Sequence, residues 1–474
     1  MNPVKVLQEL MVRSGRAWAF MRLAVAGGNL DYTTGSIRRA VLLLSIPMVL
    51  EMAMESIFAI VDIFFVSYLG AAAVATVGLT EALLSLLYAV AIGLSVAVTA
   101  LVARRIGEKN TTGAVTIAAQ TIWLGVIIGS VVGIVGVFNA EAILRFMGAG
   151  EAVIAEGKGY MAIMLGGSIN ILFLFLLNAV YRGAGNASIA MRSLWLANGI
   201  NIILDPCLIF GLGPFPEMGV TGAAIATNIG RSIGVIYQLY HLFDGRAIIT
   251  LTLKRMAFVP GIMLSLLKLS VGGIGQILIA TASWVVLMKI VAAYGSEAVA
   301  GYTIAIRIVI FTILPVMGMS NAAATLVGQN LGAAHPERAE HSVFKVLQYT
   351  FLFLVVIFIF LFIYARPLMG IFSADTAVID VGVDCLRIFA VGLFSFCLGI
   401  VLIQALNGAG DTMTPTRINL LCFWAIEIPL AWVLAEVMLL GPQGVFIAIP
   451  VAETLMAVLA WMAFRKGAWK LNKV

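Results

Sequence analysis

The sequence predicts an all-α membrane protein with twelve transmembrane helices in two six-helix lobes, related by a pseudo-two-fold axis along the membrane normal. Three observations predict it: the composition, the apolar runs and an internal repeat. Of the 474 residues, 62% are hydrophobic and 11% are charged, and the mean hydropathy is +1.07. A soluble domain is about 45 to 50% apolar and about 25% charged. The composition therefore excludes a soluble enzyme.

The apolar runs are each long enough to cross a hydrocarbon layer, which takes about 20 helical residues. They are continuously apolar, without the alternation of short barrel strands, so they indicate helices. We expect the twelve spans at 40–67, 74–102, 113–137, 159–180, 192–212, 219–243, 262–292, 298–327, 342–364, 384–405, 415–440 and 444–465.

These spans divide the chain into five segments. Residues 1–35 form a basic amphipathic arm, which either lies on the cytoplasmic membrane surface or is a frayed tail. An N-lobe of helices 1 to 6 is expected over 36–245 and a C-lobe of helices 7 to 12 over 263–466. A cytoplasmic linker at 246–262 joins the lobes, and a cytoplasmic tail at 467–474 ends the chain.

The basic residues predict the orientation. With the N-terminus inside, 22 of the 29 Lys and Arg fall on the cytoplasmic side, as the positive-inside rule requires. Both termini are then cytoplasmic in the inner (plasma) membrane. The net charge of +6 follows from this topology, so it does not indicate a nucleic-acid partner.

An internal repeat supports the two lobes. Because each half holds six spans, an even number, both halves enter the membrane from the same face, which is typical of parallel-repeat secondary transporters. At a fixed offset of 225 residues, Gly70 matches Gly295, Gly93 matches Gly318, Gly183-Ala184-Gly185 matches Gly408-Ala409-Gly410, and Gly219 matches Gly444.

The first helix carries three acids, Glu51, Glu55 and Asp62. A charge at the bilayer centre costs at least about 2.5 to 3.5 kcal/mol, so such acids are functional candidates. Their offsets place them on one helix face. They form either a proton or cation relay or a polar stripe that pairs with neighbouring helices. Pro47 leaves the Leu43 carbonyl without its donor and predicts either a hinge or a passive kink.

The fifth helix places Asn198, Asn201 and Asp205 on one face, at steps of three and four. Pro206 follows directly and leaves the Ile202 carbonyl without its helical donor. An amide, a carboxylate and a free carbonyl make an oxygen-rich cluster. Such a cluster suits a monovalent cation or a protonated acid.

The second half lacks this arrangement, because Leu287 stands where the repeat would put the first-helix aspartate. Its remaining acids, Glu427 and Glu453, are expected to form structural salt bridges with Lys289 or Arg307. Coupling is therefore expected in the N-lobe. Further polar positions that could belong to the site are Glu81, Glu427, Gln276 and Asn321.

Several motifs together resemble one transporter family, the MATE (multidrug and toxic compound extrusion) antiporters, over about 36–466. An Asp on the first helix with Asn-x-x-x-Asp on the fifth is most similar to the DinF-like branch. The motifs are AIVDIFFVSYLG at 59–70, YRGAGNAS at 181–188, NIILDPCLIFG at 201–211, GVTGAAIAT at 219–227 and NGAGDT at 407–412.

The resemblance implies export of lipophilic, often cationic organic compounds in exchange for inward H⁺ or Na⁺. It implies an N-lobe ion site, with Na⁺ possible at Asp62, Asn201 and Asp205, and places Tyr160 and Thr227 beside it. If the two aspartates approach each other in a dry pocket, two negative charges there cost much free energy, so the pair is expected to titrate as one unit.

Two other functions remain open. A flippase of lipid-linked precursors or polysaccharides, from the same superfamily, would show a cluster of cations in its cavity. An intramembrane enzyme such as a prenyl transferase would need Asp-rich motifs for Mg²⁺, and the acids here are single. We therefore expect a monomer that is not an enzyme, takes a small-molecule substrate, needs no cofactor besides the coupling ion, and binds no nucleic acid. There is no GxxxxGK[ST] loop to hold a driving nucleotide.

Overall fold

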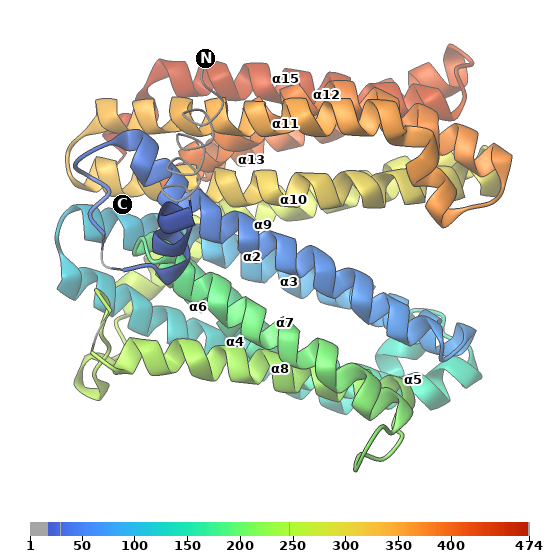
Figure 1. The fold of residues 1–474 in the computed structure, drawn as a ribbon, viewed down its shortest axis with the longest axis horizontal. Helices are drawn as coiled ribbons and strands as arrows, with labels where there is room; N and C mark the ends of the chain where they lie inside the picture. Colours follow the sequence, from blue (N-terminus) through green and yellow to red (C-terminus); the bar gives the residue numbers. More distant parts are fainter. Residues whose placement is uncertain (1–17, 29, 246, 473–474) are drawn as a thin grey trace, which may run out of the picture.

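The computed structural model describes residues 18–28, 30–245 and 247–472, which form helices and no strand. The helices lie in two lobes, one above the other in Figure 1. The N-lobe consists of α2 (Ile37–Ser67), α3 (Ala71–Gly107), α4 (Thr111–Phe146), α5 (Glu151–Gly166), α6 (Ser168–Gly183), α7 (Ala187–Phe210) and α8 (Gly219–Phe243). The C-lobe consists of α9 (Pro260–Ala292), α10 (Ser296–Gly332), α11 (Pro336–Phe372), α12 (Thr376–Gly408), α13 (Met413–Asn419), η2 (Leu420–Glu427), α14 (Ile428–Trp432), η3 (Val433–Val437) and α15 (Pro442–Lys466).

The twelve expected spans are confirmed, although two of them are interrupted. Ten spans in the described chain are long and apolar enough to cross a membrane. The other two, α2 and α8, have 31 and 25 residues, which exceeds the length that a crossing needs. The fourth span breaks at Gly167 into α5 and α6, where a Cβ would lie 1.6 Å from the Asn228 side chain. The eleventh contains the π-helical turns η2 and η3.

Most helices run beyond the apolar cores from which they were predicted. The helix α11, for example, begins at Pro336, whereas its apolar run begins at residue 342; α11 is kinked at Tyr364, where that run ends. Polar residues lengthen the first turns because they can reach the interface while their backbone stays helical. For the same reason α9 begins at Pro260, inside the expected linker.

The first and last described segments, residues 18–28 and 30–36 and residues 468–472, lie at one end of the bundle, which we call the terminal face (Figure 1). Residues 1–17 of the predicted arm lie outside the described residues. The part that is described does not rest on lipid alone, because Ala24 and Tyr32 are buried. The tail forms a short turn at Ala468–Leu471, in which Trp469 is 1% exposed.

The arm contacts both lobes. The Ser188 hydroxyl, at the start of α7, donates to the Ala24 carbonyl at 2.7 Å. On the other lobe, the Arg338 guanidinium at the start of α11 donates to three arm carbonyls. Their oxygens belong to Tyr32 at 3.2 Å, Thr34 at 2.8 Å and Gly35 at 2.9 Å. The arm is therefore a strap across the terminal face.

The lobes meet through α2, which packs on α10, and through α9, which packs on α3. Glycines let these backbones touch in the half nearer the terminal face. A Cβ on Gly93 of α3 would lie 2.3 Å from the Ile274 nitrogen of α9, and a Cβ on Gly318 of α10 would lie 2.7 Å from the Met48 carbonyl of α2. This half of the interface is tightly closed.

The other half of the interface is open. Along α10, Val327 and Leu331 near the terminal face are buried, whereas Arg307, farther from it, is exposed. Along α2, Ile57 and Phe64 are 51% and 53% exposed. The helices of the two lobes also diverge in this direction (Figure 1). The structure is therefore closed between the lobes at the terminal face and open at the opposite face.

Candidate functional site

A cavity of about 530 Å³, the outer cavity, opens in the half away from the terminal face. Most of its wall comes from the N-lobe helices α2, α3, α5, α6 and α8, and Arg307 reaches it from α10 of the C-lobe. Three carboxylates line this space. The polar and charged lining residues are Glu55, Asp62, Glu81, Tyr88, Tyr160, Thr227, Arg231 and Arg307.

Asp205 is completely buried behind the cavity wall and is connected through Asn201 to the lining residue Thr227. The Asn201 amide nitrogen donates to Asp205 Oδ1 at 3.3 Å and approaches Thr227 Oγ1 at 3.0 Å. Asp62 and Tyr160, which is 4% exposed, line the outer cavity together with Thr227. Five of the six residues that are predicted for the ion site, all except Asn198, thus lie at or directly behind this part of the cavity.

Two oxygens of this cluster lack partners. Asp205 Oδ2 and Asn201 Oδ1 are buried and accept no hydrogen bond within the described chain. A buried oxygen without a donor is costly, so a proton or a cation is the natural partner. Carboxylate, amide and hydroxyl oxygens fit H⁺ or Na⁺. The described residues contain no cluster of three or more His, Cys, Asp or Glu that could hold a metal ion.

Asn198 takes a different partner from its neighbours on α7. Its amide nitrogen donates to Glu55 Oε2 on α2 at 3.2 Å. Asn198 lines a second, smaller cavity, which lies between the lobes, rather than the ion cluster. Its position one turn earlier on α7 puts it nearer the terminal face. Its predicted place among the ion-coupling residues stays a prediction.

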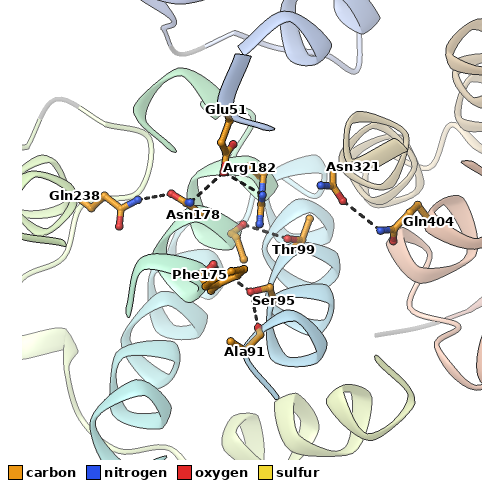
Figure 2. Close-up of polar contacts among 11 residues, drawn as sticks. Glu51, Ala91, Ser95, Thr99, Phe175, Asn178, Arg182, Gln238, Asn321 and Gln404 are labelled. Atoms are coloured by element: carbon orange, nitrogen blue, oxygen red, sulfur yellow. Dashed lines mark hydrogen bonds and ion pairs between the residues drawn. The ribbon is translucent and has the colours of Figure 1, made fainter. Parts of the chain in front are cut away.

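Glu51 is held by a polar network in the N-lobe, which Figure 2 shows. Its Oε1 accepts from the Asn178 amide at 3.0 Å and from Arg182 Nη1 at 3.3 Å. Asn178 in turn accepts a hydrogen bond from Gln238. Glu51 and Glu55 therefore both have partners on neighbouring helices, as the polar-stripe interpretation expects, and a relay through them stays a prediction.

The inner cavity, of about 250 Å³, lies between the lobes and nearer the terminal face. From the C-lobe, Asn321 lines it as expected and accepts from Gln404 at 3.3 Å (Figure 2). Gln276 does not line it. Its amide nitrogen donates to Asn407 Oδ1 and to the Thr412 carbonyl, both at 3.1 Å. The suggestion that Gln276 faces the cavity is therefore wrong, because it holds the turn after α12.

The C-lobe acids form no ion pair in the described chain, so the predicted salt bridges are wrong. Glu427 is 2% exposed and accepts from the Ser283 hydroxyl at 2.8 Å. Glu453 keeps Oε2 buried without a partner. The expected partners Lys289 and Arg307 are both exposed, because helical phase turns them away from the lobe interior.

Pro47 lies inside α2, which continues through it as one helix over Ile37–Ser67. The carbonyl of the next residue, Met48, is the one that packs against Gly318. Pro47 therefore stands at the lobe interface, and its role as a hinge stays a prediction.

Sequence reasoning missed the arginines of the two cavities. Arg182 lines the inner cavity. Arg231 lines both cavities and donates to the Tyr88 hydroxyl at 3.0 Å. The available signal was its depth, since an arginine inside a transmembrane span is itself a functional candidate.

Comparisons with known proteins agree with this geometry. The MatE family model matches residues 47–207 and 274–433. A probable multidrug resistance protein NorM of Thermotoga maritima is 28% identical over 443 residues, which cover 92% of this chain and 94% of the relative. An FAD transporter of Shewanella oneidensis is 27% identical over 429 residues, 90% of this chain and 94% of the relative.

A solved structure described as the outward-facing conformation of a multidrug resistance MATE family transporter is also similar. It has a TM-score of 0.88 and 26% identity, over 94% of this chain and 99% of that one. The family match covers well over half of the sequence and both lobes. The assignment to the DinF-like branch stays a prediction. The chain is a multi-pass membrane protein that belongs to the MatE family of transporters.

Proposed function

We propose that this protein is a secondary active antiporter that exports lipophilic, cationic organic compounds in exchange for inward H⁺ or Na⁺. The observation that carries the proposal is the buried Asp205 cluster beside the outer cavity. Its two partnerless oxygens, on Asp205 and Asn201, need a proton or a cation. That site adjoins a cavity with three carboxylates, which attract positively charged cargo.

The proposed mechanism is alternating access. The open face is assigned to the outside and the terminal face to the cytoplasm of the inner (plasma) membrane, consistent with the distribution of basic residues. An ion that enters from outside removes one negative charge from the pair formed by Asp62 and Asp205. Because their mutual repulsion then falls, α2 and α7 can approach, and the energetic preference between the two lobe arrangements changes.

The partners follow from the same proposal. The carrier acts as a monomer, binds a small molecule rather than a nucleic acid, catalyses no covalent reaction and needs only the coupling ion. A flippase for pyrophosphate-linked lipids is less well supported, since the two cavities together present four carboxylates and three guanidinium groups. The same four carboxylates would repel an anionic dinucleotide, which is the class of cargo that the name of the Shewanella relative indicates for that protein.

The test is gradient-driven transport in sealed liposomes. The wild-type protein should move a fluorescent lipophilic cation when a pH gradient or a Na⁺ gradient is imposed, and the gradient that works identifies the ion. Asp205→Asn should fold, bind the dye and lose gradient-driven transport. Glu427→Gln, a buried C-lobe acid, is the matched control and should keep it.

Normal gradient-driven export by Asp205→Asn would remove the N-lobe assignment. Loss of coupling in Glu427→Gln would place part of the coupling in the C-lobe. A wild-type protein that moves no cation under either gradient would remove the proposal itself.

A further inference from the structure

Arg231 on α8 stands where the two cavities meet, since it lines both of them. One guanidinium nitrogen, Nη2, donates to the Tyr88 hydroxyl on α3 at 3.0 Å. The other, Nη1, is buried and has no hydrogen-bond partner within the described chain. A buried guanidinium that is anchored at one nitrogen and unpaired at the other needs compensating charge.

That charge comes from acids around the cavity. Glu55, Asp62 and Glu81 line the outer cavity together with Arg231. None of these carboxylates forms an ion pair with Arg231 in the described chain. The arginine and the acids thus face a shared space instead of closing on one another in contact pairs.

The guanidinium group of Arg231 weakens the attraction of the outer cavity for a second cation. Carboxylates in a low-dielectric wall attract any cation that can reach them, and the carboxylates of the outer cavity have a tethered cation beside them. Each carboxylate's field is partly offset by the guanidinium, so a second cation gains less on entry. A cationic cargo and Arg231 therefore compete for the same negative charge.

We propose that Arg231 is a resident counter-ion of the outer cavity, which competes with cationic cargo for Glu55 and Glu81 and lowers the cavity's affinity for that cargo. The role rests on the proposed function, because it concerns the same cavity and the same class of substrate. It explains how a cavity with three carboxylates can release a cation on the open side. When the cargo leaves, the arginine remains to compensate the acids.

The test is equilibrium binding of tetraphenylphosphonium, a monovalent lipophilic cation, to the purified full chain in detergent. Arg231→Gln should bind it at least about tenfold more tightly, the change that about 1.4 kcal/mol produces. Arg231→Lys keeps the charge and should stay near wild type. Arg307→Gln is the matched control, because Arg307 lines the same cavity from the C-lobe and is exposed; it should change affinity by less than about threefold, as screened charges do.

A double variant that keeps the net charge of the cavity tests the competition even if Arg231→Gln alone does not fold. Glu81→Gln alone should weaken binding, and Arg231→Gln with Glu81→Gln should return it toward wild type, since the competitor and its acid are removed together.

Unchanged or weaker cation binding in Arg231→Gln would overturn the counter-ion role, as would an equal tightening in Arg307→Gln. If the single variant does not fold, a double variant that binds as weakly as Glu81→Gln alone would overturn it as well. Each of these results leaves the antiport proposal standing, provided that the wild type binds and transports the cation. If the wild type binds no cation, cation export is refuted and this role falls with it.

Discussion

Replacing Gly93 by alanine should shift the transporter away from the arrangement that is closed at the terminal face. A Cβ at this position would lie 2.3 Å from the backbone nitrogen of Ile274 and 2.7 Å from its Cα. Ordinary van der Waals contact begins at about 3.4 Å, so α3 and α9 would have to separate by about 1 Å. Backbone atoms cannot rotate away as a side chain would.

The magnitude follows from the cost of overpacking, which is about 1 to 3 kcal/mol. At about 1.4 kcal/mol for a tenfold change, the population ratio should shift about 5-fold to 150-fold. The cost falls on the observed arrangement alone, because α3 and α9 belong to different lobes and part when the terminal face opens. The variant should therefore favour the arrangement that is open at that face.

Gly408→Ala is the matched control. A Cβ there would lie 2.2 Å from the Ala324 carbonyl oxygen, an equally severe clash. Both residues belong to the C-lobe, on α12 and α10, so the clash persists in either arrangement of the lobes. This variant should lower the melting temperature without changing the balance between the arrangements.

The assay is the distance between two spin labels at the terminal face, measured by pulsed electron paramagnetic resonance. Thr112, at the start of α4, and Glu337, at the start of α11, are exposed and belong to opposite lobes. Labels there should show a longer distance in Gly93→Ala than in the wild type. A folded Gly93→Ala protein with the wild-type distribution, or the same change in Gly408→Ala, would refute the reasoning.

Two further predictions concern the ends of the chain. Arg338→Ala removes the donor that holds the arm, so it should lower the free energy of unfolding by about 1 to 3 kcal/mol. The control is Arg39→Ala, at an exposed arginine of α2. Equal melting temperatures for the two variants would show that the strap adds no stability. Trp469→Ala should destabilise the protein by about 3 to 5 kcal/mol, because this side chain is 1% exposed and stacks on Phe464 at 4.8 Å. Trp18→Ala, at a tryptophan that is 65% exposed, should leave the melting curve unchanged, and a wild-type curve for Trp469→Ala would contradict the packed tail.

Prediction from the sequence worked best for features that depend on a single local property, such as hydropathy or the spacing of residues along one helix. The twelve spans follow largely from hydropathy, since a helix in lipid must be apolar for about 20 residues; length and apolarity by themselves identify ten of them in the described chain. The ion cluster was also predicted, because Asn201 and Asp205 share a helix face and the resemblance added Asp62, Tyr160 and Thr227. That these residues bind the coupling ion stays a prediction.

The errors concern side chains whose partners lie on other helices. Gln276 is predicted as a position that could face the cavity and Glu427 as a partner in a salt bridge, but the structure gives them Asn407 and Ser283 as hydrogen-bond partners. Helical periodicity fixes which residues share a face, but not which neighbouring helix covers that face. Burial of Arg231 between two cavities could not be read from spacing for the same reason.

The sequence by itself determined that the chain spans a membrane, how many spans it has, that its two halves repeat, and that several acids inside the membrane need partners. These properties depend on composition and on residues close together along the chain. The tertiary structure alone decided that the lobes close at the terminal face through glycine contacts, that a strap joins them there, and that Arg231 meets the acids of the outer cavity. Such features depend on the packing of helices far apart in sequence, where a shift of one ångström changes which groups touch.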